Sequence, residues 1–241
     1  INSPERFYDR LEYVLYANDD VEPLKRISLN PSNEDFGSYV YDELKKGTYT
    51  ACFLAHSSGV LVPEKNYMTF PYINGMFYQK VKFQIDGKTD ITKEVVLQRI
   101  VSCVEFAATD TIPTDVARVH IGASQVYNRF NIFTGEVSAD FIPFKREQIF
   151  NQDDKLSKKR KSHRFFTLVP TGKFIDKGSI TALKASSDTT RHQTVAQIPI
   201  QNNRLIRYKG VLYTPATSGT TFEISIADNG AWADSTVIIL E

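Results

Sequence analysis

The chain has 241 residues, of which 29 are basic and 28 acidic, so its formal net charge is +1. Hydrophobic residues make up 41% and charged residues 24%, which is typical of a globular protein and excludes a largely disordered chain. The nearly neutral balance argues against a dedicated nucleic-acid binder. Two cysteines are too few for a disulfide scaffold or a cysteine-rich zinc site, and no apolar run is long enough to span a membrane.

Short β-prone segments separated by turn residues follow one another along the whole chain. In residues 77–85, for example, Val81, Phe83 and Ile85 alternate with polar residues before an Asp86-Gly87 turn. This spacing predicts an all-β fold of sandwiches or barrels. The predicted strands are residues 11–16, a segment after the turn at 18–20, then 47–55, 77–85, 116–121, 127–133, 164–169, 179–185, 194–200, 205–213, 222–227 and 236–240.

Helical signal is thin. Ser3-Pro4-Glu5 has an N-cap residue followed by proline, which predicts a turn or two of helix over residues 4–8. Residues 95–106 could place Val96, Ile100 and Cys103 on a helical stripe. Their β-branched content and apolar residues on both alternating faces favour a buried strand instead.

The polar, glycine-containing segment at residues 86–92 separates two strand-rich blocks. It predicts an N-terminal β-sandwich domain over residues 1–90 and a C-terminal one over residues 91–241. A second polar stretch, residues 151–163, is predicted to be a long exposed loop.

Motifs that carry enzyme chemistry are missing from the sequence: there is no phosphate-binding loop, dinucleotide fingerprint, nucleophile elbow or HExxH helix. His56, His120, His163 and His192 share no metal-ligand spacing, and no carboxylate pair is marked out for acid–base work. We therefore expect a protein that is not an enzyme, with no catalytic, cofactor-binding or metal-binding residues.

Six basic residues and no acidic one lie between Lys155 and Arg164. One interpretation is a site for an anionic partner such as a phosphate backbone, an acidic glycan or a lipid head group. No aromatic residues interleave with these charges to stack bases, so a solvated loop is favoured, and such a loop should be sensitive to proteases.

Cys52 and Cys103 both lie in apolar strands, which predicts free, buried thiols; a disulfide would need their strands to face each other. The single tryptophan, Trp232, lies near a turn at Asn229-Gly230. A tryptophan in that position can stack against a sugar, but packing over the end of a sandwich is favoured.

Several segments together resemble a known family. Residues 44–50 (LKKGTYT) resemble the L-x-x-G-x-Y-T strand of fimbrillin-like proteins of Bacteroidales type V pili. Residues 97–101 (LQRIV) resemble an L-x-R-x-V strand of the anchor and minor-subunit branch of that family. The segments at 127–136 (YNRFNIFTGE), 166–170, 198–203 and 209–213 continue the same order, so the resemblance covers nearly the whole chain.

This resemblance implies two tandem transthyretin-like Greek-key β-sandwich domains in an exported fimbrial protein, either an anchor or a minor or tip subunit. It also implies a lipoprotein signal peptide and attachment to the outer membrane through a lipidated cysteine, for which the internal Cys52 is no candidate. Family subunits polymerise when a strand of one completes the sheet of the next. The expected partners are thus other fimbrial subunits, and host or bacterial surface ligands in adhesion, with no nucleic acid.

Two points of this interpretation stay open. The apolar residues 236–240 could serve as the exchanged strand, although the final strand of the chain's own second domain is favoured. The start of the chain, with Phe7, Tyr8 and Leu11 as apolar anchors, is either a frayed end or a segment that covers the first domain. The alternative function is a surface carbohydrate-binding module, which exposed aromatic residues near Trp232 would favour.

Overall fold

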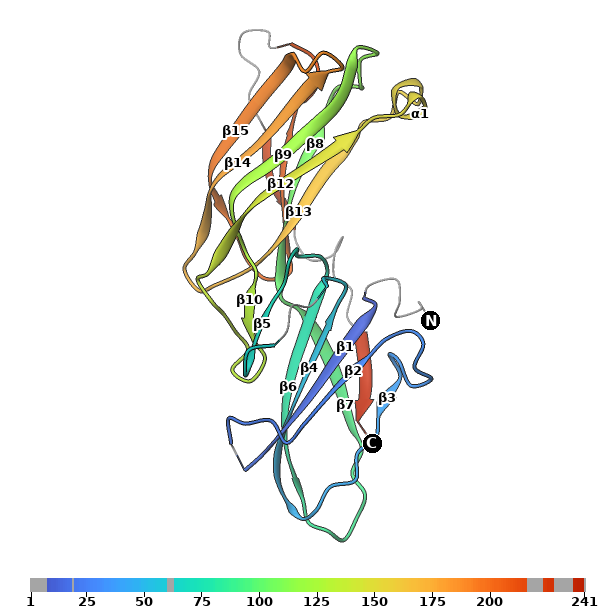
Figure 1. Cartoon of the computed structure of the whole chain (residues 1–241), viewed down its shortest axis with the longest axis vertical. Coiled ribbons are helices and arrows are strands. Elements are labelled where there is room, and N and C mark those ends of the chain that lie inside the picture. Colours follow the sequence, from blue (N-terminus) through green and yellow to red (C-terminus); the bar gives the residue numbers. More distant parts are fainter. Residues whose placement is uncertain (1–7, 19, 60–62, 216–222, 228–235, 241) are drawn as a thin grey trace. The chain divides into compact units, whose positions relative to one another are not determined.

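The computed structural model describes residues 8–18, 20–59, 63–215, 223–227 and 236–240, and of the last two segments it describes the backbone only. More than half of these residues lie in strands (Figure 1), which confirms the predicted all-β fold. The described part of the chain has one helix, α1, of five residues. No helix in that part is long and apolar enough to cross a membrane.

The chain divides into two compact units, and it passes between them more than once. The first unit comprises residues 1–101, 128–139 and 233–241, and the second comprises residues 102–127 and 140–232. The expected boundary at residue 90 therefore differs from the observed division. The polar segment at 86–92 joins two antiparallel strands of the first unit, so it is a hairpin loop rather than a linker.

The first unit is built on one long sheet with the strand order β2-β1-β4-β6-β7-β18-β3 and a small sheet with the order β11-β10-β5. Strand β4 lies between β1 and β6 in the long sheet, and eight of its residues in succession are buried. The strands are β1 (Arg10–Ala17), β2 (Lys25–Leu29), β3 (Tyr39–Val40), β4 (Gly47–His56), β5 (Tyr67–Thr69), β6 (Met76–Ile85), β7 (Lys93–Arg99), β10 (Arg129–Asn131), β11 (Glu136–Val137) and β18 (Thr236–Leu240).

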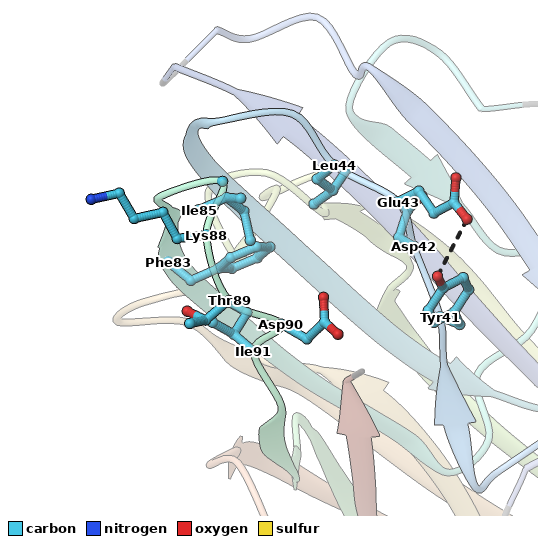
Figure 2. Close-up of a pocket in the computed structure, with 11 residues that line it drawn as sticks. Tyr41, Asp42, Glu43, Leu44, Phe83, Ile85, Lys88, Thr89, Asp90 and Ile91 are labelled. Atoms are coloured by element: carbon cyan, nitrogen blue, oxygen red, sulfur yellow. Dashed lines mark hydrogen bonds between the residues drawn. The ribbon is translucent and has the colours of Figure 1, made fainter.

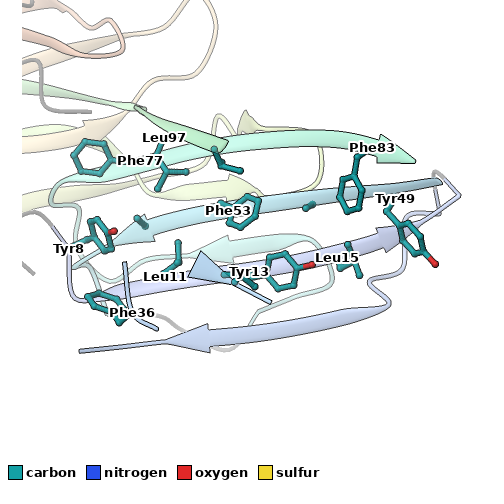
Figure 3. Close-up of a cluster of buried hydrophobic side chains, with 14 residues drawn as sticks. Tyr8, Leu11, Tyr13, Leu15, Phe36, Tyr49, Phe53, Phe77, Phe83 and Leu97 are labelled. Atoms are coloured by element: carbon teal, nitrogen blue, oxygen red, sulfur yellow. The ribbon is translucent and has the colours of Figure 1, made fainter. Parts of the chain in front are cut away.

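The core of the first unit is a cluster rich in aromatic side chains (Figure 3). Its rings come mainly from alternate positions of β1, β4 and β6, as the period of two in those strands requires. Tyr13 and Phe53, on adjacent strands, have ring centroids 5.3 Å apart. Leu97 on β7, the strand that pairs with the end of β6, also belongs to the cluster.

The second unit has two four-stranded sheets, with the orders β12-β9-β14-β15 and β13-β8-β16-β17. Phe144 and Phe165, one from each sheet, stack with ring centroids 5.1 Å apart. The elements are β8 (Val101–Ala108), β9 (Val116–Tyr127), β12 (Phe141–Ile149), α1 (Gln152–Leu156), β13 (Ser162–Leu168), β14 (Phe174–Lys184), β15 (Thr189–Pro199), β16 (Arg204–Gly210) and β17 (Glu223–Ala227).

A buried carboxylate links three strands of the second unit. Glu105 on β8 accepts a hydrogen bond of 2.6 Å from Arg164 on β13 and another from Arg207 on β16. Burial by itself would raise the pKa of Glu105, but these two guanidinium partners outweigh it and hold the pKa below its usual range. The ionised carboxylate therefore ties β8 to both neighbouring strands.

The basic segment is more ordered than a long exposed loop. Helix α1 begins at the N-cap Asn151, whose side chain and that of Asp154 form a reciprocal capping box. The Nζ atom of Lys161 lies 2.6 Å from the Asp154 carboxylate, and that of Lys155 donates to the Thr114 carbonyl. The loop prediction is thus wrong for residues 152–156 and for residues 162–163, which begin β13.

Other strand predictions agree in kind and differ in extent. Residues 95–106 are extended, as predicted, but Ile100 divides them into β7 and β8. Strand β12 was not among the predicted strands, because Pro143 interrupts it at a bulge and most of its side chains face solvent. The predicted helix over residues 4–8 lies outside the described residues except for Tyr8, and Trp232 with its turn lies outside them entirely.

We predict that His163 makes the second unit sensitive to acid. Its ring is buried between the Tyr213 hydroxyl, 2.8 Å away, and the Gln148 side chain, 2.9 Å away. Burial, aided by the charges of Arg146 and Lys161, lowers the pKa of His163 from 6.5 to about 4. Below pH 6.5 the unfolded chain binds a proton that the folded chain does not, so about 3 kcal/mol of stability is lost between pH 6.5 and 4.

Urea unfolding at several pH values measures this loss. His163→Asn should remove this loss of unfolding free energy and leave only the acid dependence that other groups cause. The control His192→Asn, at an exposed position, should leave the loss as it is in the parent chain. Equal pH slopes for the parent chain and His163→Asn would contradict the assignment.

We also predict that trypsin cuts first between α1 and β13. Lys158, Lys159 and Arg160 are exposed there, whereas the neighbouring Lys155 and Lys161 make the contacts given above. Mass spectrometry of a brief digest should find the first cleavage after one of these three residues, and replacing all three by Gln should delay it. A first cut elsewhere would show that this segment is protected.

Candidate strand-pairing site

Strand β18 completes the sheet of the first unit (Figure 1). Its backbone pairs antiparallel with β7 at five consecutive positions, from Thr236 opposite Leu97 to Leu240 opposite Lys93. On its other side it pairs in parallel with β3, where Leu240 lies opposite Val40. The expectation that these residues end the second domain is therefore corrected: they belong to the first unit, where their backbone pairs with β7 and β3.

The two neighbours of β7 pair with different parts of the strand. It pairs with β6 only where Phe77 lies opposite Arg99 and Tyr78 opposite Gln98. In the described part of the chain, the strand paired with residues 93–97 is β18. Without β18 these backbone groups would form an unpaired edge, which is a ready template for another strand.

The side chains beneath this edge are apolar. Val95 and Leu97 alternate with exposed residues along β7 and are 1% and 0% exposed. They belong to the aromatic core cluster, as does Val40 on β3. A strand lying between β7 and β3 therefore covers the hydrophobic core as well as satisfying backbone groups, and both effects favour its binding.

The described start of the chain is anchored in the same core. Tyr8 is buried, and its ring lies 5.4 Å from that of Phe36 and 6.4 Å from that of Phe77. Leu11 is also fully buried, and burial raises the pKa of Tyr8 to about 12. Two of the three predicted anchors thus hold the chain to the first unit, and the third, Phe7, lies outside the described residues.

A hollow of about 340 Å³ lies in the first unit among the residues that follow β3 and those that precede β7. Figure 2 shows Phe83 and Ile85 of β6 beside the side chains of Leu44 and Ile91. Acidic side chains stand at its rim. The charge of Glu43, reinforced by Asp90, raises the pKa of the exposed Tyr41 phenol.

The remaining residues singled out in the sequence do not gather into one site. Cys52 and Cys103 are free and buried as predicted, and burial raises the pKa of Cys52 to about 11. Among the described residues no group of three or more His, Cys, Asp or Glu side chains could hold a metal ion.

Sequence reasoning missed the pairing of β18 with β7. The apolar character of residues 236–240 was visible, but it marks a buried strand without naming its partner. Strands that pair across more than a hundred residues leave no local signal, so the register became visible only in the structure.

No protein-family model matches the chain, and no curated protein matches it. Several solved structures, in contrast, are similar to this chain. A fimbrial assembly protein from Parabacteroides distasonis is similar with a TM-score of 0.51 at 8% identity, over 98% of this chain and 93% of that one.

Two further structures give the same result. A proposed adhesin from Bacteroides thetaiotaomicron has a TM-score of 0.50 at 8% identity, over 96% of this chain and 91% of its own. A proposed cell adhesion protein from Bacteroides ovatus has a TM-score of 0.50 at 9% identity, over 92% and 86%. At such low identity the likeness concerns the fold: this chain has the β-sandwich fold of these Bacteroidales fimbrial and adhesion proteins.

Proposed function

We propose that this protein is a non-enzymatic subunit of a surface fimbrium, an anchor or a minor or tip subunit, which joins its neighbours by β-strand addition and contributes to cell adhesion. The observation that carries the proposal is the place of β18, which lies in the sheet of the first unit between β7 and β3. Residues 236–240 thus complete a sheet that also contains β1, which begins at Arg10.

Such a strand can be supplied by another molecule. The five backbone positions of β7 and the buried Val95 and Leu97 beneath them accept any strand of suitable length and apolar pattern. When β18 of one copy occupies the slot of the next, the same backbone pairing forms between chains. Because the described part of each chain supplies one slot and one such strand, repeated exchange would build a linear assembly.

The wider biological setting belongs to the same proposal. Fimbrial subunits act outside the cell, so we infer export and a location at the cell surface, with attachment to the outer membrane through a lipid anchor. The fold shared with a fimbrial assembly protein and two proposed adhesion proteins supports this setting. Other fimbrial subunits are the proposed partners.

The alternative, a carbohydrate-binding module, receives less support. A second hollow lies over β9, β12 and β14, around Gly122. Its lining in the described residues is polar and charged apart from Ile121 and Gly122, and it contains no Trp, Tyr or Phe ring on which a sugar could stack. Most aromatic side chains of the described residues are buried in the two cores instead.

We predict that β18 is exchanged between chains when they refold together. Val96 is exposed and lies opposite Val237 in the β7–β18 ladder, so a cysteine at each position can report the pairing. Chains carrying Val96→Cys and chains carrying Val237→Cys are mixed, unfolded, refolded together at high concentration under reducing conditions, and only then mildly oxidised. Non-reducing mass analysis should find a disulfide that joins the two variants, with a yield that rises with protein concentration.

The matched control replaces Val237→Cys by Lys209→Cys, an exposed position on β16 of the second unit. The buried native cysteines, with the raised pKa of Cys52, should not react. If the 96–237 disulfide forms within a single doubly substituted chain but never between chains, strand exchange is contradicted.

A further inference from the structure

The slot that holds β18 continues beyond its last described residue. Leu240 lies opposite Lys93 on one side and Val40 on the other. The chain that leaves β3 after Val40 and the chain that enters β7 before Lys93 then line the hollow shown in Figure 2. The hollow therefore lies on the path that a strand longer than β18 would follow.

The floor of the hollow is an uncovered end of the core. Strand β18 runs in the same direction as β6, since both are antiparallel to β7. Phe83 and Ile85, the last inward-facing residues of β6, pack in or against the core cluster and line the hollow. Leu44 and Ile91, which also pack against the cluster, form its apolar walls.

The rim carries an acidic pair. Asp42 is already engaged, since it accepts hydrogen bonds from Lys25 at 2.8 Å and from the Tyr13 hydroxyl at 3.2 Å. Glu43 and Asp90 are exposed and both line the hollow, where Figure 2 shows their carboxylates on the side of Tyr41. Glu43 accepts a hydrogen bond of 3.3 Å from the Tyr41 hydroxyl. Lys88 extends away from them in Figure 2.

We propose that this hollow receives the end of a longer donor strand from a neighbouring subunit and selects its sequence. The inference rests on the proposed function. In the donor strand, the second residue after the one opposite Lys93 faces the apolar floor, because side chains alternate between the two faces of a strand. The third faces outward, level with Glu43 and Asp90, so the hollow prefers an apolar residue followed by a basic one.

The preference can be tested in the full chain without any exchange. Extending residues 1–241 by Val-Lys-Gly-Ser places an apolar and a basic residue at the second and third positions past Leu240. Val-Glu-Gly-Ser reverses the charge, and Ser-Lys-Gly-Ser removes the apolar group. Calorimetry should give Val-Lys a thermal midpoint about 2 °C above Val-Glu and about 4 °C above Ser-Lys.

The variant Glu43→Gln with Asp90→Asn is the control for charge. It should abolish the difference between Val-Lys and Val-Glu but keep that between Val-Lys and Ser-Lys. Equal midpoints for all three extensions would overturn the proposal. A Lys preference that persists in the double variant would also overturn it, because the rim carboxylates would then not be its source.

A second arm tests the neighbouring subunit as the source of the strand. Peptides of residues 234–241 carrying the Val-Lys or the Val-Glu ending are added while the intact chain refolds. The Val-Lys peptide should be captured about fivefold better, and less so by the double variant. Capture of neither peptide, alongside a Lys preference within the chain, would refute a donor from outside while leaving the selectivity of the hollow itself in place.

Discussion

The backbone ladder between β7 and β18 is the interaction on which the first unit depends. Strand β7 pairs with β6 only through its last two residues, so residues 93–97, among them the buried Val95 and Leu97, need a second partner. The strand that meets this need comes from residues 236–240, more than a hundred residues away in sequence. A sheet completed by so distant a segment is held together by main-chain hydrogen bonds and core burial, both of which a strand from another molecule can reproduce.

The two units therefore differ in how they are stabilised. The second unit contains its stabilising groups internally: Glu105 between two arginines, and His163 between Gln148 and Tyr213. The first unit has an edge that must be filled and a hollow that lies beyond the strand filling it. The function that we propose therefore depends on the backbone edge of β7 and the apolar side chains beside it.

The sequence was informative wherever the signal was local. Alternation in residues 77–85 predicted β6, the apolar setting of Cys52 and Cys103 predicted buried thiols, and the overall strand spacing predicted the fold class. Prediction failed where distant contacts decide the outcome. The polar loop at 86–92 resembles a linker until β6 and β7 are seen to pair, and nothing within residues 236–240 indicates that their partner is β7. The hollow was equally invisible, because its floor and rim come from separate loops and a strand.

Amide hydrogen exchange of the full chain, followed by NMR, tests the central claim most directly. If β18 is a working strand of the first unit, the amides of residues 237–239 exchange as slowly as those of 95–97, and Ile238→Pro, which removes a backbone donor and fixes φ, accelerates both groups while β9 and β14 keep their protection. Exchange of residues 237–239 at the rate of a free peptide in the unsubstituted chain, with residues 95–97 still protected, would contradict the account.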